Sequence, residues 1–305
     1  MSDATAIVLT GGLVATACGL LGPFLVLRRQ ALLSDAVSHA VLPGIVLVFV
    51  CFGSRAPLAV IAGAAAFAVV CVLGIEALRA SGLVKADAAI ALVFPVLFAI
   101  GVIGVGSFAS GAHIDLDSTI YGEIAFTPFR TWEPAGVEVP RSIPLLGAVA
   151  LADAALLAAL WKELKVSTFD PEFARVNGFS PRLVSRLLLI AVAVTAVTAF
   201  ESVGAILVVT LLIVPAATAY LLTERLPALI ALTLAIGWLC AVAGHATATA
   251  LDASIAGAMG LVAGCCFALA LLLSPRHGLL AVAAARARRR AALRRRLGAP
   301  AAGRR

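Results

Sequence analysis

An aspartate and a histidine stand four residues apart in the stretch SDAVSHAVLPG, residues 34–44. On a helix, Asp35 and His39 would share one face, one turn apart. A carboxylate oxygen and an imidazole nitrogen placed in this way can both reach one divalent cation. Pro43 has no N–H, so the carbonyl of His39 loses its helical partner and adds an oxygen near the same place. The spacing therefore predicts two ligands of a metal site.

Spacing alone leaves a second interpretation of this pair open. In that interpretation Ser34 or Asp35 caps the start of a helix, and His39 bonds to a neighbouring helix. One aspartate–histidine pair is a weak metal signature, because two ligands make an open site. Ionisable groups at membrane depth are costly, however, and they usually mark a transport pathway.

A second motif is a short helix with signals at both ends, in the stretch FDPEFARVNG, residues 169–178. Asp170 suits the N-cap, Pro171 the first helical position, and Gly178 the C-terminal cap. A helix of about two turns is not stable alone in water, so it needs a surface for its apolar side chains. Two alternatives remain for this surface: a motor protein or the lipid surface. The apolar side chains are Phe169, Phe173 and Val176.

Three further ionisable residues lie within or at the ends of apolar runs. Glu201 and Asp252 fall at outer ends, where capping or solvation explains them. His245 lies deeper, and it either bonds to a neighbouring helix or contributes to a pathway. Glu201 and His245 are therefore candidates for further pathway residues.

The elements that carry these residues are helices in a lipid bilayer. The chain has 305 residues, of which 62% are hydrophobic and only 13% charged, and its mean hydropathy is +1.10. Such a composition cannot be hidden in a soluble domain. A bilayer core needs about 20 apolar residues per helix. Windows of this kind predict a polytopic, all-α bundle of nine spans, with eight to ten compatible: 6–27, 33–52, 56–78, 88–106, 142–161, 184–200, 202–222, 228–251 and 254–274. The seventh span follows the sixth with almost no loop, so one of the two could be short or re-entrant.

The basic residues predict the orientation. All but three of the 23 Lys and Arg residues fall on one side of the predicted spans, the exceptions being Arg55, Arg130 and Arg141. The positive-inside rule makes the rich side cytoplasmic. The C-terminus and the 170–178 helix are then inside, and the segment 107–141 is outside. The first apolar run lacks the features of a cleavable signal peptide.

Several classes of function are excluded by the same sequence. The net charge of +7 comes largely from an Arg-rich tail that follows the last span, which suits anionic lipid better than nucleic acid. The six cysteines lie in apolar runs without a C-x-x-C pair, so we interpret them as packing residues. No phosphate loop and no H-E-x-x-H or G-x-S-x-G motif occurs. The chain is not expected to hydrolyse ATP or to be an enzyme.

Four stretches in order resemble the permease subunits of the zinc/manganese/iron ABC importer family. They are RQALLSDAVSHAVLPG (29–44), FDPEFARVNGFSPR (169–182), VGAILVVTLLIVPAATAYLLT (203–223) and SPRHGLL (274–280). The outer stretch IDLDSTIYGEIAF (114–126) resembles the same family. The likeness covers nearly the whole chain up to about Leu280. We therefore expect a permease domain over 1–280 and a basic Ala/Arg-rich cytoplasmic tail over 281–305, which is not part of the family pattern.

The resemblance implies partners and roles for these residues. It implies two permease copies, a cytoplasmic ATP-binding subunit on each side, and an extracytoplasmic metal-binding protein. By position, Asp35 and His39 fall on the family's pathway metal site. The 170–178 segment falls on its coupling helix, the element that contacts the ATPase. The residues of that motif are Asp170, Pro171, Glu172, Phe173, Arg175 and Gly178.

The predicted function is the permease of an ATP-driven, alternating-access importer for manganese, zinc or iron(II). The expected location is the bacterial cytoplasmic membrane, with the metal as cargo and no permanently bound cofactor. One alternative is a secondary transporter driven by an ion gradient, with Asp35, His39 and Glu201 as a proton relay. The capped cytoplasmic helix argues against it, because such a carrier needs no motor contact. A membrane-embedded enzyme is a further alternative, but no catalytic group appears.

Overall fold

The computed structural model describes residues 2–52, 57–108, 123–132, 139–274 and 278. The tail 281–305 and the stretch 114–122 of the outer motif lie outside the described residues. The helices are α1 (Asp3–Leu27), α2 (Leu32–Phe52), α3 (Pro57–Ala80), α4 (Ala86–Phe108), η1 (Ile124–Phe129, a 3₁₀-helix), α6 (Ser142–Ala159), α7 (Trp161–Phe169), α8 (Pro171–Val176), α9 (Pro181–Val203), α10 (Ala205–Leu222), α11 (Leu226–Leu251) and α12 (Ile255–Leu273). The strands β1 (Thr131–Trp132) and β2 (Val139–Pro140) form one short antiparallel pair.

The predicted membrane bundle is confirmed. Among the described residues, eight helices are long and apolar enough to cross a bilayer. The remaining predicted span corresponds to α2, whose apolar part runs from Asp35 to Cys51. The small β1–β2 pair was not predicted from the sequence. It lies in the segment between α4 and α6 and does not change the all-α class.

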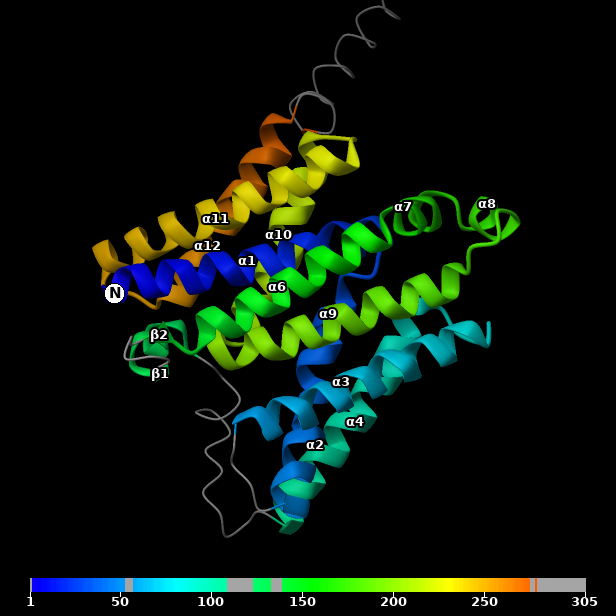
Figure 1. The fold of residues 1–305 in the computed structure, drawn as a ribbon, viewed down its shortest axis with the longest axis horizontal. Coiled ribbons are helices and arrows are strands. Elements are labelled where there is room, and N and C mark those ends of the chain that lie inside the picture. Colours follow the sequence, from blue (N-terminus) through cyan, green and yellow to red (C-terminus); the bar gives the residue numbers. More distant parts are fainter. Residues whose placement is uncertain (1, 53–56, 109–122, 133–138, 275–277, 279–305) are drawn as a thin grey trace, which may run out of the picture.

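The helices form two groups joined by α9. Figure 1 shows α1, α10, α11 and α12 together at one side of the molecule and α2, α3 and α4 at the other. Helix α9 contacts α1, α6 and α10 in the first part and α2 and α3 in the second. Helices α7 and α8 stand at the end of the bundle opposite the N-terminus and the β1–β2 pair (Figure 1). This arrangement makes α9 the central element of the fold.

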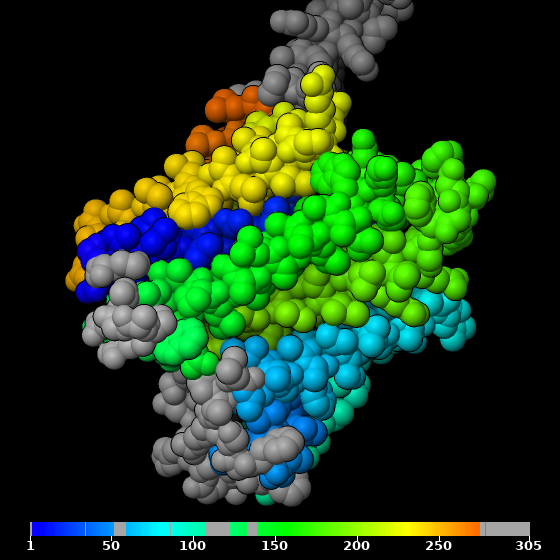
Figure 2. All heavy atoms as spheres, in the orientation of Figure 1, coloured from blue at the N-terminus to red at the C-terminus, as the bar shows by residue number. Residues whose placement is uncertain are grey.

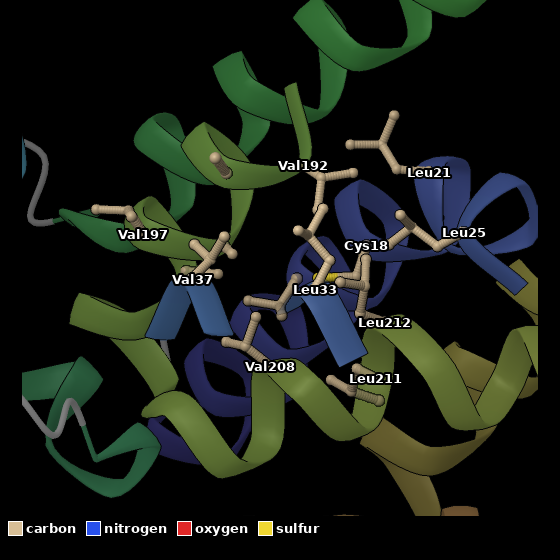
Figure 3. Packing of buried hydrophobic residues seen from close by; sticks show 14 of the residues in the cluster. Cys18, Leu21, Leu25, Leu33, Val37, Val192, Val197, Val208, Leu211 and Leu212 are labelled. Atoms are coloured by element: carbon tan, nitrogen blue, oxygen red, sulfur yellow. The ribbon is translucent and has the colours of Figure 1, made fainter. Parts of the chain in front are cut away.

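The core lies where α1, α2, α9 and α10 meet. Figure 3 shows Leu21 of α1, Val37 of α2, Val192 of α9 and Leu211 of α10 in one cluster of buried side chains. All four side chains are buried. Because lipid tails are as apolar as these side chains, close packing rather than exclusion from water holds them together. The start of α2 is thus fixed in the centre of the molecule.

The boundary between the sixth and seventh predicted spans is a single residue. Helix α9 ends at Val203 and α10 begins at Ala205, with Gly204 between them at φ +84°. Glycine adopts this positive φ at little cost, because it has no Cβ. Both helices meet the length of a membrane span. Neither helix is therefore too short to cross a bilayer.

Candidate metal site and motor-contact helix

Asp35 and His39 lie on one face of α2, as their spacing predicts. His39 Nε2 is 3.9 Å from Asp35 Oδ1, and the two side chains are 47% and 61% exposed, respectively. Helix α2 begins at Leu32, so Ser34 and Asp35 lie inside its first turn rather than at its N-cap position. Neither residue therefore stands at the N-cap position, and a metal role for the pair stays a prediction. The pair points out of the described protomer instead of into its core.

Two phenylalanine rings of α4 hold the imidazole of His39. The ring centroid of Phe94 lies 5.8 Å from that of His39 in a stacked arrangement, with 30° between the planes. Phe98 lies at 5.8 Å in an edge-on arrangement, at 80°. Aromatic rings can orient an imidazole without using its nitrogens. Both nitrogens of His39 thereby remain available for a proton, Asp35 or a metal ion.

Helix α4 reaches this position through a close contact with α2. Pro43 lies inside α2 and is buried. A Cβ placed on Gly101 of α4 would stand 2.9 Å from the backbone nitrogen of Pro43. The two helices can approach this closely because Gly101 has no side chain. The proline that frees the carbonyl of His39 also marks the place where α4 packs.

The chain brings two residues of metal-ligating type together here. No group of three or more His, Cys, Asp or Glu side chains suited to a metal ion occurs among the described residues. Asp35 and His39 therefore form an open site, which water, a freed carbonyl or a second chain would have to complete. A site with few ligands is suited to passing an ion on rather than storing it.

The structure does not bring the other predicted pathway residues into such a group. Glu201 lies half-buried in the last turn of α9, close enough to Arg141 and Arg130 to interact electrostatically. His245 lies half-buried on α11, and its buried Nδ1 has no hydrogen-bond partner in the described part of the chain. Asp252 ends α11 in the left-handed conformation. A pathway role for Glu201 and His245 stays a prediction.

The predicted short helix is present with the predicted caps. Helix α8 runs from Pro171 to Val176, and the Phe173 N–H donates a hydrogen bond to Asp170 Oδ1 at 2.9 Å. Gly178 follows at φ +81°, so a glycine suits the exit of the helix. Ala174 alone is buried, whereas Glu172 and Arg175 are exposed. The sequence motif therefore folds as a capped helix.

The apolar side chains of this segment are left uncovered. Phe169 and Phe173 are more than half exposed, and Val176 is 87% exposed. Figure 2 shows the segment as a green projection at one end of the molecule. Exposed aromatic side chains on a projecting segment are typical of a contact surface. The helix thus has the shape and chemistry of a docking element.

Sequence reasoning missed two features that position these sites. The first is α7, which carries α8 and buries Leu164 and Ser167 against the bundle. Its signal is the short amphipathic stretch WKELKVSTF after the fifth span. The second is the pair Phe94 and Phe98, four residues apart on α4. Their spacing is visible in the sequence, but their contact with His39 depends on tertiary structure.

Comparisons with known proteins decide the family. A family profile described as the ABC 3 transport family matches residues 4–274. The chain belongs to the ABC 3 transport family. Its sequence is 42% identical over 281 residues to the manganese transport system membrane protein MntD of Bacillus subtilis, covering 92% of this chain and 95% of that protein. It is 43% identical over 274 residues to the zinc transport system membrane protein TroD of Treponema pallidum, covering 90% and 75%.

A solved structure extends this likeness to the fold. The structure described as PsaBC from Streptococcus pneumoniae in complex with Fab matches with a TM-score of 0.74 and 27% identity, covering 91% of this chain and 94% of that chain. The prediction of an ABC metal-importer permease is confirmed. The chain is a transport subunit and not itself an enzyme, and its family implies ATP-binding and substrate-binding partners. A gradient-driven secondary transporter is not favoured.

Proposed function

We propose that Asp35 and His39 hold a manganese or zinc ion in transit through this permease. The observation that carries the proposal is the pair itself, which lies on one face of α2 and is exposed beside the rings of Phe94 and Phe98. An imidazole with a carboxylate suits manganese and zinc, and also iron(II). The relatives compared above are named for manganese and zinc, which supports these two metals first.

The open side of this site faces a second permease copy. Ionisable side chains at membrane depth do not face lipid without cost. The helices that carry this site also expose apolar side chains, such as Leu47 of α2 and Phe98 of α4. A second copy on this face would exclude lipid and bring a second aspartate–histidine pair near the first. The ion then passes between the two copies, and no permanently bound cofactor is required.

The α8 helix is the contact with the cytoplasmic ATPase. Its uncovered Phe169, Phe173 and Val176 would fill a groove on that subunit. ATP-driven closure of the two motor subunits would then change which side of the permease is open. An extracytoplasmic binding protein delivers the ion, so tight selection occurs there. We accordingly propose a location in the bacterial cytoplasmic membrane, with α8 and the C-terminus inside.

The test is metal uptake in the complete transporter. Asp35→Ala and His39→Ala should each abolish accumulation of radiolabelled manganese and zinc while membrane abundance and ATPase co-purification stay normal. Asp87→Ala is the matched control, because Asp87 is an exposed aspartate in the first turn of another span. Normal uptake by both the Asp35 and the His39 variant would refute the transit site.

A further inference from the structure

A single arginine ties the end of α1 to α7. Arg28 follows α1 directly, and its Nε–H donates a hydrogen bond to Thr168 Oγ1 at 3.0 Å. Its Nη2 donates a second hydrogen bond to Ser167 Oγ at 2.9 Å. Both hydroxyls lie in the last turn of α7, and Asp170 both ends α7 and caps α8. The guanidinium is thus hydrogen-bonded to α7, the helix that leads into α8.

Arg28 remains a cation in this position. Burial, with the neighbouring Arg79 adding to it, lowers the pKa of the Arg28 guanidinium to about 10. The side chain is therefore charged at neutral pH, and both of its hydrogen bonds are charge-assisted. Such bonds are stronger than those between neutral groups. The link between α1 and α7 is accordingly firm.

Arg28, at the other end of this link, is separated from Asp35 and His39 by one short turn. The turn 28–31 joins α1 to α2 with Arg29 at φ +56°. It is closed by backbone hydrogen bonds from Gln30 N–H to the Leu25 carbonyl at 2.9 Å and from Leu33 N–H to the Gln30 carbonyl at 3.1 Å. A turn that is so short and bonded at both ends passes on a displacement rather than absorbing it. Asp35 lies in the first turn of α2 beyond it.

On the opposite side of the turn, two buried side-chain oxygens have no hydrogen-bond partner in the described part of the chain. They are Oε1 of Gln30 and Oε2 of Glu76. Both residues line a small pocket between the turn, α3, α4 and α9. The pocket lies beside the turn. Its lining residues are Arg29, Gln30, Leu33, Ile75, Glu76, Arg79, Ile90 and Leu189.

We propose that Arg28 is a positioning residue that passes the motion of α7–α8 to the turn 28–31 and so to Asp35 and His39. The proposal rests on the function proposed above, in which α8 contacts the ATPase and the Asp35/His39 pair holds the ion. A competing route runs through α9, which follows α8 in the chain and packs on α3. That route needs no contact at Arg28, so the two can be separated.

The experiment removes the two hydrogen bonds between Arg28 and α7, first from one side and then from the other. Arg28→Ala removes the donors, and the double variant Ser167→Ala/Thr168→Val removes the acceptors while leaving Arg28 in place. The permease is reconstituted with its ATPase and binding protein, and manganese uptake and ATP hydrolysis are measured in the same vesicles. Both variants should keep the ATPase bound and hydrolyse ATP, but transport about tenfold less metal for each ATP consumed. The triple variant should be no worse than Arg28→Ala, because both changes remove one interaction.

Controls distinguish the loss of the Arg28 hydrogen bonds from a general loss of stability. Thr210→Val removes a hydroxyl that bonds to the Ile206 carbonyl of its own helix at 2.8 Å, and it should transport normally. Arg28→Lys should be intermediate, because an ammonium keeps the charge but lacks the planar fork. If Arg28→Ala does not accumulate in the membrane, the nearly isosteric variant Ser167→Ala/Thr168→Val provides the test alone.

A normal ratio of metal to ATP in the hydroxyl variant would overturn the proposal, as would losses that add independently in the triple variant. Failure of the proposed function looks different. In that case Asp35→Ala would transport, or Phe173→Asp would retain its ATPase and its coupling. If Phe173→Asp uncouples the transporter and the Arg28 and hydroxyl variants do not, the route through α9 stands and the Arg28 proposal alone fails.

Discussion

At the scale of single residues, the proposed metal site of Asp35 and His39 depends on its aromatic neighbours. Two protein ligands bind an ion weakly, so their orientation decides whether both reach it at once. The rings of Phe94 and Phe98 fix the imidazole of His39 from α4. The carboxylate of Asp35, one turn before it, is exposed and free to meet the ion. The site is thus built from two helices, although both ligands come from one.

Phe98→Ala should weaken transport without abolishing it. An aromatic contact contributes about 0.5–1.5 kcal/mol, so the apparent KM for the metal should rise by roughly three- to tenfold. Uptake rates over a range of manganese concentrations give this value. Leu92→Ala, which truncates another exposed side chain of the same helix, is the control. An unchanged KM for Phe98→Ala would show that these rings do not orient His39.

At the scale of elements, glycines decide how closely α2 can approach α3. A Cβ added to Gly44 would stand 2.3 Å from the carbonyl oxygen of Gly63. No real Cβ tolerates such a distance, so α2 would have to move away from α3. Because Asp35 and His39 belong to α2, this packing contact also sets the position of the site.

Gly44→Ala should therefore cost both stability and transport. Overpacking of this kind costs about 1–3 kcal/mol. We expect a lower midpoint of thermal unfolding in detergent and reduced metal uptake at equal membrane abundance. Gly260→Ala is the matched control, because nothing in the described chain lies within 4 Å of the added Cβ. Equal unfolding midpoints for the two variants would contradict the close α2–α3 contact.

Helix α8 leaves large apolar side chains exposed, which a partner would cover. Its Phe173 side chain is exposed, and burying a phenylalanine against a partner is worth about 1.5–3 kcal/mol. Phe173→Asp should therefore lower recovery of the ATPase on co-purification by about tenfold or more and uncouple hydrolysis from transport. Leu83→Asp places the same charge at another exposed apolar residue, in the turn between α3 and α4, and should have no effect. Full recovery of the ATPase with Phe173→Asp would leave the lipid surface as the site of α8.

At the scale of the whole molecule, the two ends of the bundle differ in character. One end carries α7, α8 and the turn between α3 and α4, and the other carries η1 and the β1–β2 pair (Figure 1). From the distribution of Lys and Arg we propose that the first end is cytoplasmic. The Arg28 link belongs to this scale as well, because it connects the exposed end of the molecule with the start of α2.

Labelling from one side of the membrane tests this orientation. In a chain whose six cysteines are replaced by alanine, Phe129→Cys should react from outside with a membrane-impermeant thiol reagent. Leu83→Cys should react only after the membrane is opened. Both positions are highly exposed, so access from each side is the variable. Reaction of Leu83→Cys in sealed cells would reverse the orientation and remove α8 from the cytoplasm.

The sequence by itself determined whatever depends on neighbours along the chain. Runs of about 20 apolar residues predicted the spans within a few residues, because a bilayer imposes that length on any helix. The α8 helix was predictable because its caps, Asp170 and Gly178, act within a few residues of its ends. The shared face of Asp35 and His39 follows from the period of the α-helix.

Only the tertiary structure decided which side chains meet across the bundle. That His39 lies against Phe94 and Phe98, and that Arg28 grips Ser167 and Thr168, depends on contacts between residues far apart in the chain. The sequence could assign Arg28 only to the cytoplasmic side. In a membrane, burial does not distinguish the faces of an apolar helix, so hydropathy carries no information on which face meets which. Packing at glycines and a few polar contacts make that choice. They place Arg28, one short turn before α2, against the helix that carries α8.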